Sequence, residues 1–177
     1  MGMSGSLFLL VWATAMAAMM LPSELPLFRL AHATTQSKAQ TGALASGYAA
    51  VWLVVGIAAM ALPELPGAIV LGGAALFQLT PLKRRCLNVC RSPLARVVHG
   101  WRDGHAGAFR MGVENACWCF GCCVGLTLVL VALGMTNVVW LVVVGAAIYL
   151  EKATRAGVLA SRVVAVALGI GAVAWAI

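Results

Sequence analysis

The chain alternates between long apolar runs and shorter polar segments, and this pattern predicts helices that cross a membrane. Six apolar segments can be marked, over residues 5–21, 43–62, 67–82, 117–133, 136–150 and 158–176. A helix needs about 20 residues to span the hydrocarbon core of a bilayer. The segments 43–62 and 158–176 reach that length, whereas 67–82 and 136–150 are short. We therefore expect a bundle of about six transmembrane helices.

Turn residues divide these segments. The apolar stretch 116–150 is too long for one span, and Gly134, Thr136 and Asn137 supply a turn within it. Two related motifs, "LPSELP" at 21–26 and "LPELP" at 62–66, are each expected to end a helix, because proline lacks a backbone N–H. Within the polar region 83–116, "PLKRRCLNVCRSP" indicates a short helix closed by Pro93, with turns at Gly100, Asp103-Gly104 and Gly107.

The basic residues give this bundle a direction. In a six-span arrangement the loops 22–42, 83–116 and 151–157 lie on one side, and they hold every Lys and Arg except Arg162. Cytoplasmic loops carry the excess of Lys and Arg. We therefore predict a multi-pass protein of the bacterial inner membrane, with both termini on the non-cytoplasmic side and a basic cytoplasmic loop at 83–116. That loop carries no nucleic-acid motif, so its predicted partner is the anionic leaflet of the lipid bilayer.

Composition supports a membrane protein and argues against an independent enzyme. Hydrophobic residues make up 63% of the chain, charged residues 10%, and the mean hydropathy is +0.99, whereas a soluble domain carries about 25% charged residues. The 19 glycines favour close approach of helices and contact with other membrane subunits. The chain lacks HExxH, GxSxG and P-loop motifs. We predict one transmembrane domain over residues 1–177 that is not catalytic by itself.

The cysteines are the strongest chemical signal. Four of the six lie in "CWCFGCC" at 117–123. On a helix, Cys119, Cys122 and Cys123 share one face, and Cys86 and Cys90 share another by the same spacing. The neighbouring Lys and Arg residues at 83–85 and 91 are expected to lower the pKa of Cys86 and Cys90. Soft thiolates select Cu(I), zinc or iron–sulfur clusters. An isolated cysteine is more often a packing residue, but this density favours metal or redox chemistry.

Methionines and buried charges add to this pattern. Met19 and Met20 follow Met16 at helical spacing, and Glu24 continues the same line. Thioethers are Cu(I) ligands, although methionine more often fills gaps in a core. The carboxylate of Glu151 is expected to pair with one of the nearby basic side chains, which are Lys152, Arg155 and Arg162. Gln78 and Asn137 are expected to form hydrogen bonds between helices.

Four stretches occur in a characteristic order: "AMAAMMLPSELP", "FQLTPLKRRCLNVCRSP", "CFGCC" with "GMTNVVW", and "YLEK". In this order the chain resembles a bacterial family labelled "predicted metal-binding integral membrane protein". The resemblance implies a multi-helix membrane fold and a metal site. The residues that it implies as ligands are Met19, Met20, Cys86, Cys90, Cys119, Cys122 and Cys123. Asn137 and Glu151 belong to the motifs without an assigned role. The family commonly has histidine one turn before the CxGCC cysteines, where this chain has Asn115.

Three functions follow from the sequence. The first is a small membrane protein that binds and passes on Cu(I), with zinc as the second choice of metal, through Cys119, Cys122 and Cys123, assisted by Cys86 and Cys90. The second is a structural or accessory subunit of a larger membrane metalloenzyme, such as a copper membrane monooxygenase. The third is a thiol-redox membrane protein, against which the strain of a disulfide between the adjacent Cys122 and Cys123 counts.

Overall fold

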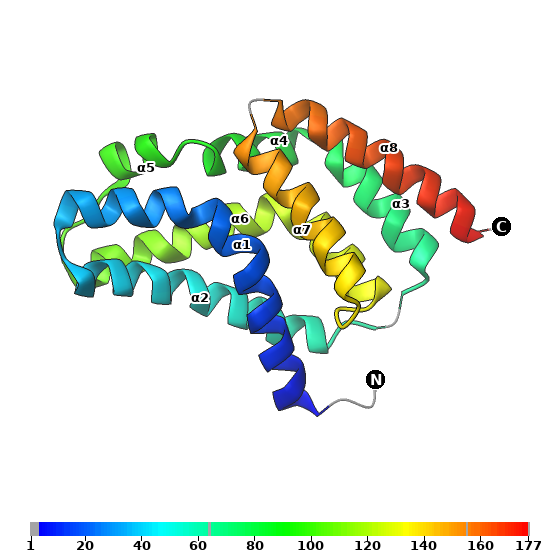
Figure 1. Ribbon diagram of the computed structural model, residues 1–177, viewed down its shortest axis with the longest axis horizontal. Helices are drawn as coiled ribbons and strands as arrows, with labels where there is room; N and C mark the ends of the chain where they lie inside the picture. The colour runs from blue at the N-terminus through cyan, green and yellow to red at the C-terminus, as the bar shows by residue number, and fades with distance from the viewer. Residues whose placement is uncertain (1–3, 64, 155, 177) are drawn as a thin grey trace.

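Helices are the only regular secondary structure in the residues that the structure, a computed structural model, describes: 4–63, 65–154 and 156–176. Figure 1 shows the arrangement of the eight helices found there. They are α1 (Gly5–Thr35), α2 (Lys38–Met60), α3 (Gly67–Gln78), α4 (Pro81–Cys90), α5 (Pro93–Gly100), α6 (Gly104–Leu133), α7 (Val138–Ala153) and α8 (Gly157–Ala176). Each of the six apolar segments predicted from the sequence lies largely within one of these helices.

The polar segments are far more helical than the sequence suggested. The expected loop 22–42 consists of the second half of α1 and the start of α2, joined at Gln36 in the left-handed region with φ 50°. The expected loop 83–116 holds most of α4, all of α5 and the first turns of α6. The turns at Gly100 and Asp103-Gly104 are confirmed, but Gly107 lies inside α6. Polar residues mark segments that contact water. An exposed helix is as polar as an exposed loop, so polarity alone does not distinguish the two.

The "LPSELP" motif does not end a helix. Both Pro22 and Pro26 lie inside α1, which continues to Thr35. Proline within a helix removes a backbone hydrogen bond and produces a kink, and Figure 1 shows α1 bending near its middle. Ser23 Oγ donates to the Met20 carbonyl at 2.8 Å, which satisfies a backbone acceptor at the bend. The second motif behaves as predicted in its first part, because α2 ends at Met60; Glu64 lies outside the described residues.

Four of the described helices, α1, α2, α6 and α8, are long and apolar enough to cross a membrane. By contrast α3 has only 12 residues and α7 has 16. The predicted turn at Gly134 is confirmed, since α6 ends at Leu133 and Gly134 takes a φ of 103° that favours glycine. The structure thus supports a membrane protein, while six spans and the placement of both termini stay predictions.

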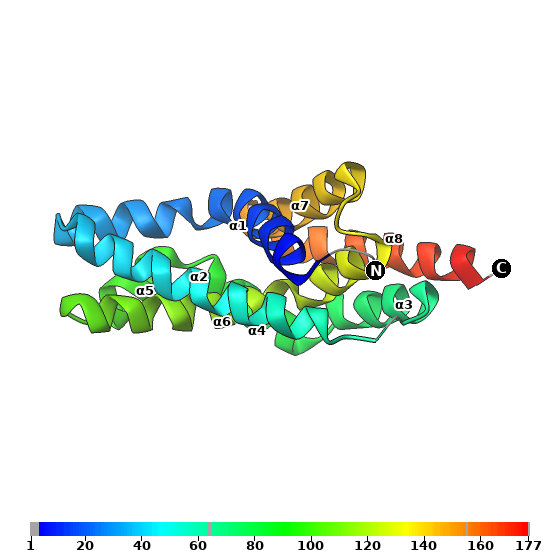
Figure 2. The same ribbon diagram turned by 90° about the horizontal axis from the view of Figure 1, so that it is seen from below.

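Small residues bring the helices together. Figure 2 shows α1 and α7 in one layer, with α2, α3, α5 and α6 in the other. Where α2 crosses α6, a Cβ on Gly47 would stand 2.1 Å from the Phe109 carbonyl oxygen, and one on Gly112 would stand 2.0 Å from that of Leu44. Only glycine permits this approach, as expected for close-packed membrane helices. The main apolar core includes the buried methionines of α1 and the buried cysteines of α4 and α6.

We predict that Gly112→Ala destabilises the protein, because the added methyl group must push α2 away from α6. The expected loss is about 1–3 kcal/mol, typical of overpacking, measured by denaturant unfolding in detergent. The matched control is Gly42→Ala on α2, where nothing lies within 4 Å of the new Cβ and alanine favours the helix. Equal stability of Gly112→Ala and the wild type would contradict the proposed tight crossing.

Candidate metal centre

The buried sulfur of Cys119 lies at the centre of the cluster. This residue of α6 has no exposed surface, and its Sγ accepts a hydrogen bond from Lys152 Nζ at 2.9 Å. The Tyr48 hydroxyl of α2 lies 3.0 Å from the same sulfur, and Met20 Sδ of α1 lies 3.9 Å from it. Because an ammonium group can only donate, the Cys119 sulfur is an acceptor here. A purely packing cysteine does not require such a contact.

The structure confirms that Cys119, Cys122 and Cys123 lie on one face of α6, as their spacing predicts. Cys122 and Cys123 are buried together with Cys119, whereas Cys117 is exposed. The thiols of Cys122 and Cys123 both donate to the Cys119 carbonyl oxygen at 3.0 Å. These two sulfurs therefore satisfy a backbone acceptor, and each must change rotamer to share a metal with Cys119. Accordingly, no group of three His, Cys, Asp or Glu side chains within the described ranges is poised to hold a metal ion.

The two cysteines of α4 approach the cluster from the side. Cys86 Sγ lies 2.8 Å from where a Cβ on Gly121 would stand, so it fills the notch left by that glycine. The Cys90 thiol interacts with that of Cys122. The expected lowering of their pKa values is wrong: burial raises the pKa of Cys86, and the interaction with Cys122 followed by burial raises that of Cys90. Both thiols must therefore lose a proton to bind a metal.

The methionines divide into two groups. Met20 is fully buried and lies against Cys119. Met19 instead packs on α7, where a Cβ on Gly145 would stand 3.0 Å from Met19 Cγ and 3.5 Å from its sulfur. Met16 is buried in the same apolar core. The structure thus brings Met20 to the sulfur cluster and gives Met19 a packing contact with α7.

A buried network of charges surrounds the cluster. Lys152 Nζ of α7 donates to Glu24 Oε1 of α1 at 2.8 Å, and Asn115 Nδ2 of α6 donates to Glu24 Oε2 at 2.8 Å. Lys152 also lies 3.4 Å from Ser23 Oγ. All of these charged groups are almost completely buried. One turn before Cys119, Asn115 thus holds the Glu24 carboxylate in place.

A second buried pair lies one residue away on α7. The expected partners of Glu151 are corrected: its Oε2 pairs with Lys83 Nζ of α4 at 2.7 Å, while Gln78 Nε2 of α3 donates to its Oε1 at 2.8 Å. The expected interhelical role of Gln78 is therefore confirmed. Asn137 instead caps α7 by accepting from the Val139 N–H at 3.0 Å. Of the other partners expected for Glu151, Arg155 lies outside the described residues.

The sequence places Glu24 on the same line as the methionines of α1 but does not predict Lys152 and Tyr48 as neighbours of the cysteines. From the sequence, Lys152 is expected only as a partner for Glu151, its neighbour in the chain. The available signal was the pair of charges in "YLEK" at the end of an apolar segment, since adjacent helical residues point in different directions and each buried charge needs a partner. Tyr48 carried no signal, because its hydroxyl meets Cys119 only through the crossing of α2 and α6.

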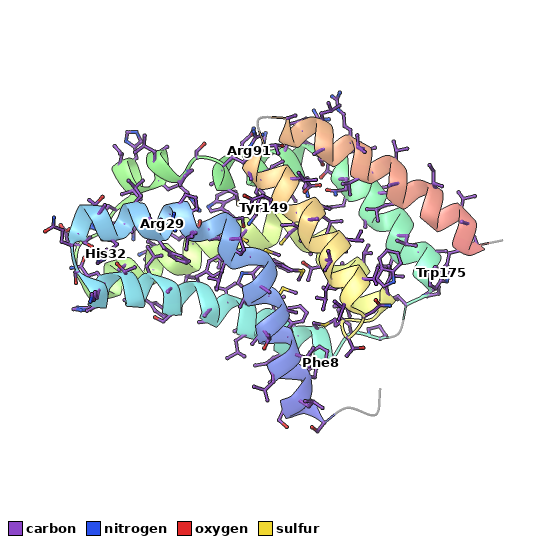
Figure 3. All side chains as sticks on the ribbon, in the orientation of Figure 1. Phe8, Arg29, His32, Arg91, Tyr149 and Trp175 are labelled. Atoms are coloured by element: carbon purple, nitrogen blue, oxygen red, sulfur yellow. The ribbon has the colours of Figure 1, made fainter. Side chains whose placement is uncertain are left out.

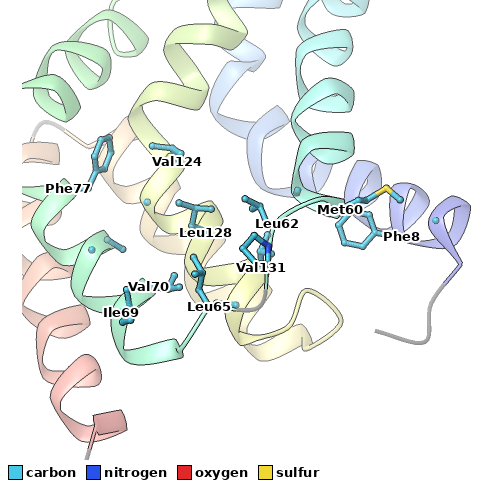
Figure 4. Close-up of a pocket in the computed structure, with 17 residues that line it drawn as sticks. Phe8, Met60, Leu62, Leu65, Ile69, Val70, Phe77, Val124, Leu128 and Val131 are labelled. Carbon is cyan, nitrogen blue, oxygen red and sulfur yellow. The ribbon is translucent and has the colours of Figure 1, made fainter.

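A large cavity lies away from this chemistry. It occupies about 840 Å³ beside α3, α6 and the segment linking α2 to α3, and Figure 4 shows its lining. The described residues that line it, Phe8, Phe77 and Leu128 among them, are all apolar or glycine. Such a cavity suits a hydrocarbon chain and offers no ligand set to a metal ion.

The sulfur donors present suit a soft monovalent metal. Metal–sulfur bonds of about 2.3 Å, as in zinc sites, can bridge two sulfurs 3.9 Å apart, the separation of Cys119 and Met20. Thiolate and thioether together favour Cu(I) over harder ions. Rotation of Cys122 or Cys123 away from the Cys119 carbonyl would add a further thiolate.

The fold and the site together define a helical, strongly apolar protein with a buried group of soft sulfur donors beside a lysine. A family model described as "PpoB2: Copper chaperone" matches residues 9–176. The chain therefore belongs to the PpoB2 copper chaperone family. This confirms the predictions of a metal-related family and of copper handling at the level of the family. No curated protein and no solved structure matches the chain.

We predict that Lys152→Met strongly destabilises the protein, because it leaves the Glu24 carboxylate buried without its cation. Breaking a buried pair in this way costs about 3–5 kcal/mol. The double variant Glu24→Gln/Lys152→Met should recover part of that loss. Denaturant unfolding in detergent measures both effects.

The control for this prediction is an exposed pair on the same helix as Cys119. Glu114 and Arg110 are 47% and 65% exposed and lie 3.1 Å apart. Glu114→Gln should cost less than about 1 kcal/mol. A loss for Lys152→Met that is no larger than this would show that the buried network contributes little to stability.

Proposed function

We propose that the protein is an integral membrane chaperone for Cu(I), which it holds between the Cys119 thiolate and the Met20 thioether, with Cys122 or Cys123 as a further ligand. The contact of Cys119 Sγ with Met20 Sδ at 3.9 Å, beside the Lys152 ammonium at 2.9 Å, is the observation that carries this proposal. Membership of a copper chaperone family supports it.

The lysine explains how such a site stays intact without its cargo. Lys152 and Glu24 neutralise each other at 2.8 Å, and the Lys152 ammonium also donates to the Cys119 sulfur. Cu(I) carries the same charge as the proton that it replaces on the Cys119 thiol, so binding at this sulfur leaves the net charge of the buried site unchanged. The site can therefore load and unload Cu(I) without leaving an unbalanced buried charge.

The surroundings favour transfer over permanent storage. The thiols of Cys122 and Cys123 rest on the Cys119 carbonyl and can rotate towards the ion, so the ligand number can change during loading. Copper in such a site passes on by exchange of one sulfur ligand for another, without a change of oxidation state. A recipient protein in or at the same membrane is part of this proposal, as are the six spans and the bacterial inner membrane.

We predict that wild-type protein, purified in detergent under reducing and anaerobic conditions, retains stoichiometric Cu(I), and that the triple variant Cys119→Ser/Cys122→Ser/Cys123→Ser loses it. The serine hydroxyl is a hard ligand and does not replace a thiolate for Cu(I). Elemental analysis after gel filtration measures the copper content, and far-UV circular dichroism tests whether the variant is folded.

Cys117→Ser is the matched control, because Cys117 belongs to the same motif but is exposed on the opposite side of α6. It should bind copper as the wild type does. Full copper content in the triple variant would refute the assigned ligands. A reversible loss of thiols on mild oxidation, with no copper bound by the wild type, would favour the thiol-redox function instead.

A further inference from the structure

A small polar cavity opens beside the sulfur cluster, between α1, α4, α5, α6 and α7. Its volume is about 240 Å³, and its lining includes Cys90, Arg91, Arg96, Asn115, Tyr149 and Lys152. Arg91, which directly follows α4, and Tyr149 of α7, both labelled in Figure 3, belong to this lining. Unlike the large apolar cavity, it touches both the basic segment 83–116 and the charged network around Cys119.

The lining presents polar atoms that the described part of the chain leaves without a partner. Asn115 is only 1% exposed, yet its Oδ1 accepts no hydrogen bond there, and Nη1 of Arg96 is likewise buried and makes none. Buried polar groups of this kind require water or a ligand. A polar cavity of this size accommodates several water molecules. We therefore expect water in this cavity, whose lining reaches Lys152 next to Cys119.

Cys90 connects this cavity to the sulfur cluster. It is half-buried and lines the cavity, whereas Cys119, Cys122 and Cys123 are buried and absent from the lining. Cys90 packs against the core that contains Cys119, Cys122 and Met20. Within that core the Cys122 thiol donates to the Cys119 carbonyl, and the Cys119 sulfur lies against that of Met20. Cys90 is thus the cysteine at the cavity, with the other sulfurs behind it.

The charge of the cavity indicates the form in which copper arrives. Arg91, Arg96 and Lys152 outnumber the single carboxylate of Glu24 in its lining. Lys152 is already paired with Glu24, and Arg91 donates to the Thr154 carbonyl, which leaves Arg96 to act on a ligand. A cleft lined by one sign of charge attracts ions of the opposite sign. Copper(I) held by two thiolates is an anion and matches this field.

We infer that this cavity is the port through which Cu(I) reaches the site, delivered as an anionic thiolate complex that Arg96 attracts, and that Cys90 is the first protein ligand to take the ion. This rests on the proposed function. In the exchange, Cys90 forms a bond to copper as a carrier thiolate leaves, and the Cys90 proton passes to that thiolate. Copper remains Cu(I) throughout, and a second exchange moves it from Cys90 to Cys122.

The test follows transfer of Cu(I) from its anionic, coloured bicinchoninate complex to reduced protein in detergent, by stopped-flow absorbance. We expect Cys90→Ser to bind as much copper at equilibrium as the wild type but to load about tenfold more slowly, which corresponds to a barrier higher by about 1.4 kcal/mol. Cys117→Ser, which changes an exposed thiol outside the cavity, should load at the wild-type rate.

A charge variant tests the port separately. Arg96→Gln should slow loading from the anionic complex by roughly tenfold at low salt and reduce the dependence of the rate on salt. The control is Arg85→Gln on α4, because Arg85 is exposed and does not line the cavity. Equal rates for the Arg96 and Arg85 variants would overturn the role of Arg96.

The outcomes separate this inference from the proposed function. A wild-type protein that takes up no copper overturns both. Normal uptake with an unchanged loading rate in Cys90→Ser overturns the port alone. A loss of bound copper in Cys90→Ser as complete as that of the triple cysteine variant also overturns the port, because Cys90 would then be a permanent ligand. If Cys90→Ser does not fold, alkylation of Cys90 in folded Cys117→Ser protein, verified by mass spectrometry, must slow loading for the inference to stand.

Discussion

The rest of the structure depends on the two adjacent charges at the end of α7. Lys152 pairs with Glu24 of α1 and contacts Cys119 of α6, while Glu151 pairs with Lys83 of α4 and accepts from Gln78 of α3. One short helix therefore fixes four others through fully buried polar contacts. Buried charges are costly unless each finds its partner, so this arrangement permits only one relative placement of the five helices.

The same contacts link stability to chemistry. Cys119 is part of the apolar core and also a member of the charged network, because Lys152 donates to its sulfur. The kink of α1 at Pro22 and Pro26 lies beside Met20 and Glu24, which bring a thioether and a carboxylate to the same place. The sulfur donors, the charged groups beside them and the helices that hold both thus form one connected network.

The molecule also divides into parts with different surroundings. The long helices α1 and α6, of 31 and 30 residues, exceed the about 20 residues that a bilayer core requires. Their polar ends join α5 and the start of α2 to form a helical extension, on the left of Figure 1. The polar cavity is lined by residues from the second half of α1 and from α5 of this extension, together with Asn115 of α6 and Lys152 of α7.

The sequence by itself determined the helical class, the positions of the apolar segments, the turn at Gly134 and the common helix face of Cys119, Cys122 and Cys123, because these depend on local periodicity and turn chemistry. The sequence led to wrong predictions for the end of α1 at Pro22 and Pro26, for the partner of Glu151 and for the direction of the pKa shifts of Cys86 and Cys90. Only the tertiary structure decided these, since a proline kink is tolerated when neighbouring helices pack around it, and since burial and distant partners, set by helix packing, fix both ion pairs and thiol protonation.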